Sequence, residues 1–510
     1  LGDVYKRQAY QEVAMAKKIF AFIMAAVLAF TAFAGCTAQK DADTAKENIT
    51  TTKKVTDDSN FKLSYTQADS LDPFKSKTQN NQVLSSLVFE SLFDIDENWE
   101  SVPNIATKYE FSDGKTLKVS FNPSLTFSDG SPIESDDIIY SFNVAKKSPA
   151  YKNSLKYIGS ASAGADNTIV FYLKKANPNA VNLLTFPIAS TNYDENGYPI
   201  GSGRYKYVKK DSKTYLKAIV TKDFNPYITT INLVNIAAAD SIDNAVNIGN
   251  ISYAFRDLSS NVAERMTCNR KLINMNNLVY IGVNSLSGIT ANAQIRKAIS
   301  LACDRNTFAE SAYNGYGTAA TSPFNPQSSL AQNVKIFSSE ADTSTAKQAI
   351  AQSGIDSKEL KLNILVNKND NRTACAALLK NQLEAVGFTV TIDEVSTKEY
   401  ARRVKGVEFN LYIGEVKLSD DMSLYPFFDD NSGGVRYGID NKSLTCDDLY
   451  CAYLSGEADL GKFILAFNEE MPYIPLIYKK GMICYTKAMS GDMQGYWSNY
   501  FSNIDTWYFE

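Results

Sequence analysis

Histidine is absent from all 510 residues of this chain. Without an imidazole group, a Ser-His-Asp or Cys-His catalytic site cannot form. The H-E-x-x-H zinc motif and every histidine metal ligand are excluded as well. The chain also lacks a G-x-S-x-G motif, and only catalysis without histidine, such as a carboxylate pair, is left. These absences argue against a secreted hydrolase, and our expectation is a protein that is not an enzyme, with no cofactor and no bound metal.

Cysteine spacing gives no sign of a metal site either. The chain contains seven cysteines, none of which forms a C-x-x-C pair or a zinc pattern. They are Cys36, Cys268, Cys303, Cys375, Cys446, Cys451 and Cys484. In an exported protein, some of the last six could pair as disulfides. The interpretation that we favour is a scattered set of small, mostly buried hydrophobic side chains.

Excess positive charge is lacking too. The formal charge is -4, and without residues 1–35 it becomes -6, because four basic and two acidic residues are removed. A mildly acidic chain gives no electrostatic reason to bind nucleic acid. The length usually requires more than one hydrophobic core, so we expect at least two lobes.

No apolar run reaches the length of a membrane span. The longest begins after Lys17-Lys18, covers residues 19–34 and ends in Gly35-Cys36. A span needs about 20 apolar residues, and a small residue followed by cysteine is typical of signal-peptide cleavage. The segment resembles the lipobox of bacterial lipoproteins, which implies a lipid anchor on Cys36 at the extracytoplasmic face of the cell membrane. A transmembrane helix is the alternative.

The signal-like segment also sets the expected boundaries at the start of the chain. Met15 is the first sensible start, so residues 1–14 are expected to be a non-native leader. Residues 15–35 would be the signal peptide. Residues 36–60 are polar and lack apolar periodicity, and they are therefore predicted to form a flexible, lipidated tether.

Strand-like and helix-like segments alternate from residue 61 onward. Apolar alternation predicts strands at 61–65, 116–121, 168–173, 278–283, 360–366 and 388–392. Helical spacing predicts helices at 83–93, 135–142 with Ser135 as N-cap, 293–304, 308–313 and 373–386. The strand, helix, Gly387 and strand between 360 and 392 form a βαβ pattern, which indicates a parallel sheet in an α/β fold.

Four groups of motifs occur in a characteristic order. They are Ser70-Leu-Asp-Pro73 with Leu87–Leu92, Val102–Ala106 and Leu125–Phe142; Gly201–Lys206; Ile281–Asn284 with Ile295–Arg305; and Pro472–Leu476. Each is weak alone, and most have a plain structural explanation as turns or helix faces. As an ordered set they resemble family 5 of the bacterial extracytoplasmic solute-binding proteins, which serve peptide- and nickel-type ABC importers.

This resemblance implies the fold. It is a two-lobed α/β fold of the periplasmic-binding-protein type II, with an extra subdomain (cluster C-like) and mixed sheets flanked by helices. Residues 61–100, 200–275 and 481–510 would form lobe I, residues 101–199 its extra subdomain, and residues 276–480 lobe II. The lobes would close over a ligand.

The resemblance also implies a function. The protein would capture a peptide or a related small solute in the cleft between the lobes, and deliver it to an ABC permease in the membrane. It would act as a monomer. The alternative is a membrane-anchored peptide sensor or chaperone on the same fold, without transport.

The expected ligand-binding segment departs from the family pattern. In peptide-binding members a buried strand is followed by Trp-x-x-Asp, whose carboxylate pairs with the amino terminus of the peptide. Here the predicted strand is 409–413, and Glu415 and Leu418 occupy the Trp and Asp positions. Glu415 is the acid expected to anchor the ligand, unless the ligand carries no free amine. Lys417 is a ligand contact or a solvated charge, and Asp420-Asp421 either replace Glu415 or only cap a turn.

Two further groups complete the predicted ligand contacts. Glycine lets a backbone approach a ligand closely, which applies to Gly433 and Gly434. Arg436 could hold a carboxylate, with Tyr437 beside it, although a surface turn explains this stretch equally well. The last two, Asn80 and Asn81, precede the first helix and are expected to face the cleft as polar contacts.

Overall fold

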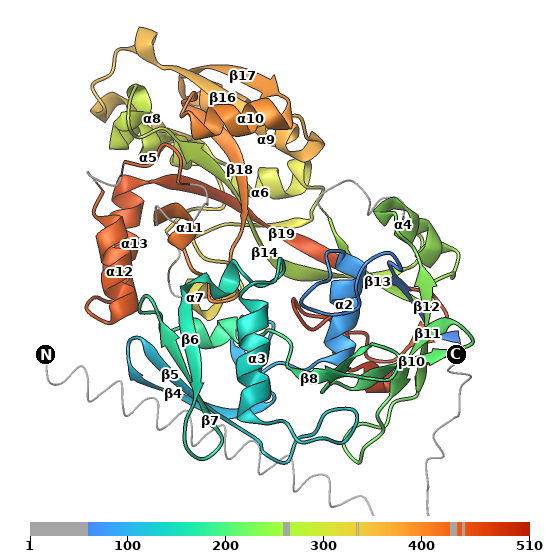
Figure 1. Cartoon of the computed structure of the whole chain (residues 1–510). Coiled ribbons are helices and arrows are strands. Elements are labelled where there is room, and N and C mark those ends of the chain that lie inside the picture. Colours follow the sequence, from blue (N-terminus) through green and yellow to red (C-terminus); the bar gives the residue numbers. More distant parts are fainter. Residues whose placement is uncertain (1–59, 259–265, 333, 335, 429–435, 441–443) are drawn as a thin grey trace, which may run out of the picture. The chain divides into compact units, whose positions relative to one another are not determined.

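The computed structural model describes residues 60–258, 266–332, 334, 336–428, 436–440 and 444–510. Its largest element is an 11-stranded mixed sheet (Figure 1). In spatial order its strands are β10 (Tyr205–Lys210), β11 (Lys213–Ala218), β12 (Thr230–Asn235), β1 (Lys62–Tyr65), β13 (Tyr253–Asp257), β19 (Tyr473–Tyr485), β14 (Asn269–Val283), β18 (Leu411–Lys417), β16 (Lys361–Asn367) and β17 (Thr389–Val395), and β15 (Gly317–Ala319) pairs with β19. The predicted signal peptide, Cys36 and the predicted tether as far as residue 59 lie outside the described residues.

Two long antiparallel strands, β14 and β19, join the halves of this sheet. The end of β19 at 481–485 pairs with β13, and the end of β14 at 277–283 pairs with β18. The two strands pair with each other from Asn269 to Gly282, with a register shift between Asn274 and Leu278. Every strand on one side is therefore connected to the other side through this pair (Figure 1).

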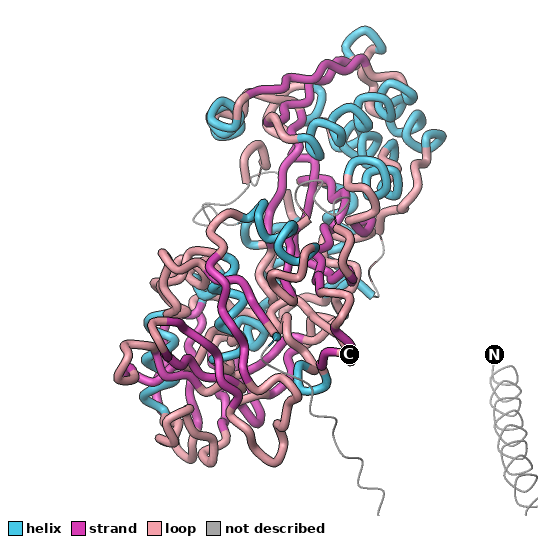
Figure 2. Tube along the Cα trace, turned by 90° about the vertical axis from the view of Figure 1, so that its right-hand side faces the viewer, coloured by secondary structure: helices cyan, strands magenta, loops and turns pink. Residues whose placement is uncertain are grey.

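The predicted βαβ unit is confirmed. β16 and β17 are parallel, with Lys361 opposite Thr389, and α9 (Asp370–Val386) connects them. Gly387 ends the helix at φ 114°, a left-handed conformation that favours glycine. Figure 2 shows the helices in cyan gathered beside magenta strands, and α5 (Ala293–Ala302), α8 (Thr343–Gln352) and α10 (Thr397–Lys405) belong to the same region.

A second sheet of four antiparallel strands lies outside the first. Its order is β4 (Ala106–Asp113), β5 (Thr116–Phe121), β7 (Thr168–Leu173) and β6 (Ile158–Ala163), and the strands predicted at 116–121 and 168–173 are confirmed. Helix α3 (Ser135–Ala145) packs on it through Phe142 against Phe171. The predicted N-cap Ser135 is wrong, because Glu134 caps the helix in a capping box with Asp137.

Several other described helices and strands are short or peripheral. They are α2 (Gln79–Val88), α4 (Ala239–Asn247), α6 (Arg305–Thr307), a π-helix (Phe308–Ala312), α7 (Ser329–Gln332), α11 (Tyr425–Phe428), α12 (Cys446–Ser455), α13 (Leu460–Glu470), β2 (Phe93–Ile95), β3 (Ser101–Pro103), β8 (Ala189–Tyr193), β9 (Pro199–Gly201), β20 (Met489–Ser490) and β21 (Tyr508–Phe509). The helix predicted at 83–93 corresponds to α2, which starts four residues earlier and ends five residues earlier than predicted. Phe93 belongs to β2, so the apolar spacing there combined a helix with a strand.

Buried apolar side chains form two large clusters among the described residues. One contains residues from Leu278 to Tyr478, joined by Ile95 and Trp99, and the other runs from Phe61 to Met275 and from Ile483 to Trp507. Within the described ranges no cysteine forms a disulfide, and Cys303, Cys375, Cys446 and Cys484 are buried. This agrees with the interpretation of cysteine as a small core residue.

Two glycines let tyrosine rings cross the pair β14–β18. Gly282 lies opposite Tyr412 and Tyr280 opposite Gly414, so each ring covers the glycine of the neighbouring strand. A methyl group at either glycine would overlap that ring. The rings meet edge to face with centroids 5.8 Å apart, which fixes the register of β18 against β14.

Gly282→Ala should therefore lower the free energy of unfolding by about 1–3 kcal/mol, the usual cost of overpacking a core. Urea unfolding measures the change. The matched control is Gly114→Ala, where the nearest atom to a new methyl group is Ala176 Cβ at 3.4 Å. Equal stability of the two variants would contradict the role of the glycine–tyrosine pairs.

Candidate functional site

The strand predicted at 409–413 is β18, but it runs from Leu411 to Lys417. Pairing with β14 continues through Glu415 and Lys417, so both side chains lie on the strand and not after it, which corrects the sequence prediction. They are two residues apart and therefore on one face of the sheet. The segment that follows, Leu418–Met422, is called the 418–422 loop below.

Asp420 in this loop is held by two donors from distant parts of the chain. Trp497 Nε1 donates to its Oδ1 at 3.1 Å, and Thr185 Oγ1 donates to its Oδ2 at 3.4 Å. Burial raises the pKa of Asp420 to about 6, although the neighbouring Lys417 ammonium and the two hydrogen bonds oppose the shift. Asp420 is thus a half-buried acid that is protonated at a higher pH than an ordinary aspartate.

The Asp421 carboxylate accepts hydrogen bonds in and around the 418–422 loop. It is 5% exposed, and Asn177 Nδ2 donates to its Oδ2 at 2.7 Å. Its Oδ1 accepts from Ser419 Oγ and from the backbone N–H of Ser423. The predicted turn-capping role of this residue is therefore supported by the structure.

Lys417 contacts the face of the same tryptophan ring. Its Nζ lies 3.8 Å from the centroid of the Trp497 ring, a cation–π contact. The side chain is exposed, yet burial by the surrounding atoms lowers the pKa of its ammonium, while Asp420 and Asp257 raise it.

Aromatic side chains extend the surface around Trp497. The rings of Phe255 and Tyr500 lie 6.3 Å and 6.0 Å from its ring. Burial raises the pKa of the Tyr500 and Tyr151 hydroxyls, and the negative charge of Asp420 raises both further. Both hydroxyls therefore lie within electrostatic reach of this acid.

Glu415, the predicted ligand anchor, already has partners within the protein. Its carboxylate accepts from Lys479 Nζ at 3.1 Å and Arg372 Nη2 at 3.2 Å, and Asn277 Nδ2 donates to it at 2.9 Å. Burial alone would raise the pKa of Glu415, but Lys479, Asn277 and Arg372 hold it below its ordinary value. A ligand amine would have to displace one of these cations to reach the carboxylate.

The two predicted asparagines belong to α2 and face different surroundings. Asn81 is 1% exposed and bonds the backbone of Thr66 and Ser70, so it supports the chain around it. Asn80 is half-buried and donates to the Ile236 carbonyl at 3.2 Å. It also lines a cavity of about 20 Å³ together with aromatic residues that include Phe255.

Of the other predicted ligand contacts, the structure describes Arg436 and Tyr437. Gly433 and Gly434 lie outside the described residues. Arg436 is half-buried and donates from Nη1 to the Phe428 carbonyl at 2.9 Å. Tyr437 packs partly buried against the core that contains β18. Within the described ranges, no hydrogen bond, ion pair or ring contact joins either residue to Asp420 or Lys417.

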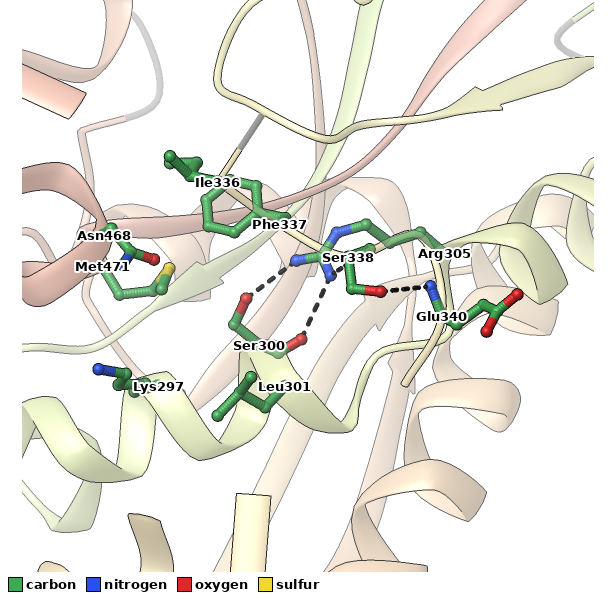
Figure 3. A pocket seen from close by; sticks show the side chains of 10 residues that line it. All are labelled: Lys297, Ser300, Leu301, Arg305, Ile336, Phe337, Ser338, Glu340, Asn468 and Met471. Carbon is green, nitrogen blue, oxygen red and sulfur yellow. Dashed lines mark hydrogen bonds between the residues drawn. The ribbon is translucent and has the colours of Figure 1, made fainter. Parts of the chain in front are cut away.

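A separate hollow of about 50 Å³ lies beside Arg305 (Figure 3). Arg305 is 1% exposed and donates to Pro475 O at 2.9 Å, Ser338 O at 3.1 Å and Ser300 Oγ at 2.9 Å. Since Ser300 lies in the last turn of α5, the cation also meets the negative end of that helix. The arginine ties α5 to β19, and we assign this hollow to structure.

Sequence reasoning missed Trp497, Thr185 and Asn177. Each lies far from residue 420 in the chain, with no motif of its own. The one available signal was the scarcity of tryptophan, with three in the chain. Within the described ranges, no three potential metal-ligating side chains come together, and no helix is long and apolar enough to cross a membrane.

Comparison with known proteins gives a consistent result. The model of the bacterial extracellular solute-binding proteins, family 5 (middle), matches residues 100–434. The oligopeptide-binding protein AppA of Bacillus subtilis is 23% identical over 391 residues, which are 69% of each chain. The nickel-binding protein NikA of Staphylococcus aureus is also 23% identical, over 71% of this chain and 75% of that one.

Solved structures show the same fold. The substrate-binding protein CtaP of Listeria monocytogenes superposes with a TM-score of 0.67 at 19% identity, covering 88% of this chain and 99% of that one. The putative peptide-binding protein AppA from Clostridium difficile superposes with a TM-score of 0.67 at 20% identity, covering 88% of this chain and 100% of that one. The expected two-lobed α/β fold is thereby confirmed.

The Glu415 cluster makes a prediction about stability. Glu415→Gln removes the charge that faces Lys479, whose side chain is 1% exposed, and should lower the free energy of unfolding by about 1–3 kcal/mol. Urea unfolding measures it. Glu384→Gln is the control, because Glu384 pairs with Lys380 on the exposed side of α9 and should change stability by less than about 0.5 kcal/mol. Equal losses would mean that the Glu415 contacts add nothing.

Asp420 makes a prediction about pH. Its pKa is about 6 in the folded protein against about 3.9 in an unfolded chain, so the folded state binds the proton more tightly. This group therefore favours folding below pH 4 and loses that contribution as pH rises to 6. Relative to wild type, Asp420→Asn should gain roughly 1–3 kcal/mol between pH 4 and 6.5.

Chemical unfolding across this pH range tests the claim. The control is Asp223→Asn, because the Asp223 side chain is 82% exposed and its variant should follow wild type throughout. A constant difference between wild type and Asp420→Asn would show that the raised pKa is wrong.

Proposed function

Because this chain belongs to family 5 of the bacterial extracellular solute-binding proteins, we propose that it is the lipid-anchored substrate-binding component of an ABC importer. It captures a peptide or a related small solute outside the cytoplasm and delivers it to a membrane permease. It acts by binding and not by catalysis. The anchor is lipid on Cys36, a proposal supported by the signal-like segment before it.

The observation that carries this proposal is the meeting of three distant segments at the 418–422 loop. Lys417 and Asp420 belong to the proposed lobe II, whereas Trp497 comes from the C-terminal part of the proposed lobe I and Thr185 from its extra subdomain. A charged pair on an aromatic surface at the junction of two lobes suits the capture of a polar solute.

Closure of the lobes is the proposed mechanism. The long strands β14 and β19 connect the two halves of the large sheet and are the natural hinge. A ligand that touches both lobes binds the closed state better and shifts the equilibrium toward it. Asn80, Lys417 and Arg436 remain proposed ligand contacts, together with Tyr437, Gly433 and Gly434. For Glu415 that role requires the displacement of Lys479 or Arg372.

The proposal predicts that the protein carries or acquires a small solute. Native mass spectrometry of the purified protein should show an added mass, which is lost after unfolding and refolding and regained with a peptide mixture. Small-angle scattering should then give a smaller radius of gyration for the loaded protein than for the empty one. A protein that never gains mass from any mixture, or whose scattering is identical at saturation, would contradict capture by closure.

A further inference from the structure

We propose that Lys417 is the ligand-recognising cation of this chain, and that it selects small solutes which carry a carboxylate. The inference rests on the proposed function as a solute-binding protein, and it names the chemical class of the solute. It assigns to Lys417 the role of determining specificity, with Trp497 as the surface on which the carboxylate-bearing part of the solute lies.

The position of Lys417 is fixed by its backbone and its ring contact. It is the last residue of β18 and lies opposite Asn277 of β14. Its ammonium rests on the face of Trp497, with 3.8 Å between Nζ and the ring centroid. The indole N–H of the same ring is bonded to Asp420, 3.1 Å away. The tryptophan is thereby held at its edge, and its face positions the ammonium.

Within the described ranges Lys417 lacks a direct ion pair, in contrast to three cations that are paired with carboxylates. Arg256 is paired with Asp243 at 2.8 Å, and Arg372 and Lys479 share Glu415. In the parts of the chain that the structure describes, Lys417 has no carboxylate within 4.0 Å of its Nζ and no hydrogen-bond acceptor. Three donor positions of its ammonium are therefore open to solvent or to a ligand.

The surroundings of this ammonium favour binding of an anion. The protein atoms around Lys417 partly remove its hydration, which lowers its pKa even though the side chain is exposed. A charge that has already lost part of its hydration gains more from a direct partner than a fully hydrated one does. An oxyanion that reaches Lys417 would supply this missing partner.

Asp420 favours a singly charged anion over a doubly charged one. Its carboxylate lies at the edge of the same indole ring, so a dianion such as a phosphate monoester at Lys417 would be repelled by it. A ligand ammonium directed at Asp420 would in turn meet the positive charge of Lys417. A carboxylate carries one negative charge, so Asp420 repels it less than a dianion while Lys417 attracts it. The exposed part of the Trp497 ring can pack against the carbon atoms next to it.

Matched peptides provide the test. Full-length protein is incubated with an equimolar pool of mixed-sequence tripeptides and pentapeptides, each present as the free acid and as the C-terminal amide. Peptides that stay bound after gel filtration are measured by mass spectrometry for wild type, Lys417→Met, Lys417→Arg and the control Lys462→Met, whose lysine is exposed on α13. Thermal unfolding confirms that each variant is folded.

Wild type and Lys462→Met should retain free acids over amides by about tenfold, which corresponds to about 1.4 kcal/mol. Lys417→Met should lose the preference, and Lys417→Arg should keep it because the positive charge is preserved. Peptides retained without a preference in wild type, or with the same preference in Lys417→Met, would overturn the inference and leave the proposed function standing. Retention of no peptide by wild type would count against peptide capture itself, and the inference would fall with it.

Discussion

The hydrogen bonds of two adjacent aspartates hold the centre of this molecule together. Asp421 accepts a hydrogen bond from Asn177, in the segment that follows the four-stranded sheet. Asp420 accepts hydrogen bonds from Trp497, in the C-terminal part of the chain, and from Thr185. Asn276 of β14 adds bonds to the carbonyls of Leu418 and Ser419. Because these groups are buried or half-buried, each must be satisfied within the protein. One five-residue loop therefore bonds elements from four parts of the chain in this conformation, and the surface that we propose for binding lies where they meet.

The same region shows how neighbouring charges acquire different roles. Glu415 and Lys417 lie two residues apart on one face of β18. Glu415 accepts hydrogen bonds from Lys479, Arg372 and Asn277, whereas the direct contact of Lys417 within the described ranges is with an aromatic ring. A carboxylate with three donors is stabilised in its charged form and contributes to folding. An ammonium that has no carboxylate in direct contact contributes less to stability and can accept such a partner from outside. We therefore transfer the expected role in ligand recognition from the acid to the lysine.

Local patterns predicted elements well where neighbouring residues alone decide the structure. The βαβ unit at 360–392 follows from short-range periodicity and a glycine stop, and the structure agrees with it. Prediction was less accurate where distant strands decide. β18 continues to Lys417 because β14 pairs with it, although Gly414, Glu415 and Lys417 are poor strand formers. The start of α3 was one residue off, since the capping box uses the side chain of Glu134, which acts in place of the more common serine.

The sequence by itself determined that no histidine chemistry is possible, that the fold is α/β, and, through the order of its motifs, which family the chain resembles. These properties depend on composition and on patterns within short windows. Only the tertiary structure decided which charged side chains are already paired. Lys479 lies 64 residues from Glu415, and Trp497 lies 77 residues from Asp420. No local pattern records a partner at such a distance, because the pairing is created when the long strands and the C-terminal segment fold against the 418–422 loop.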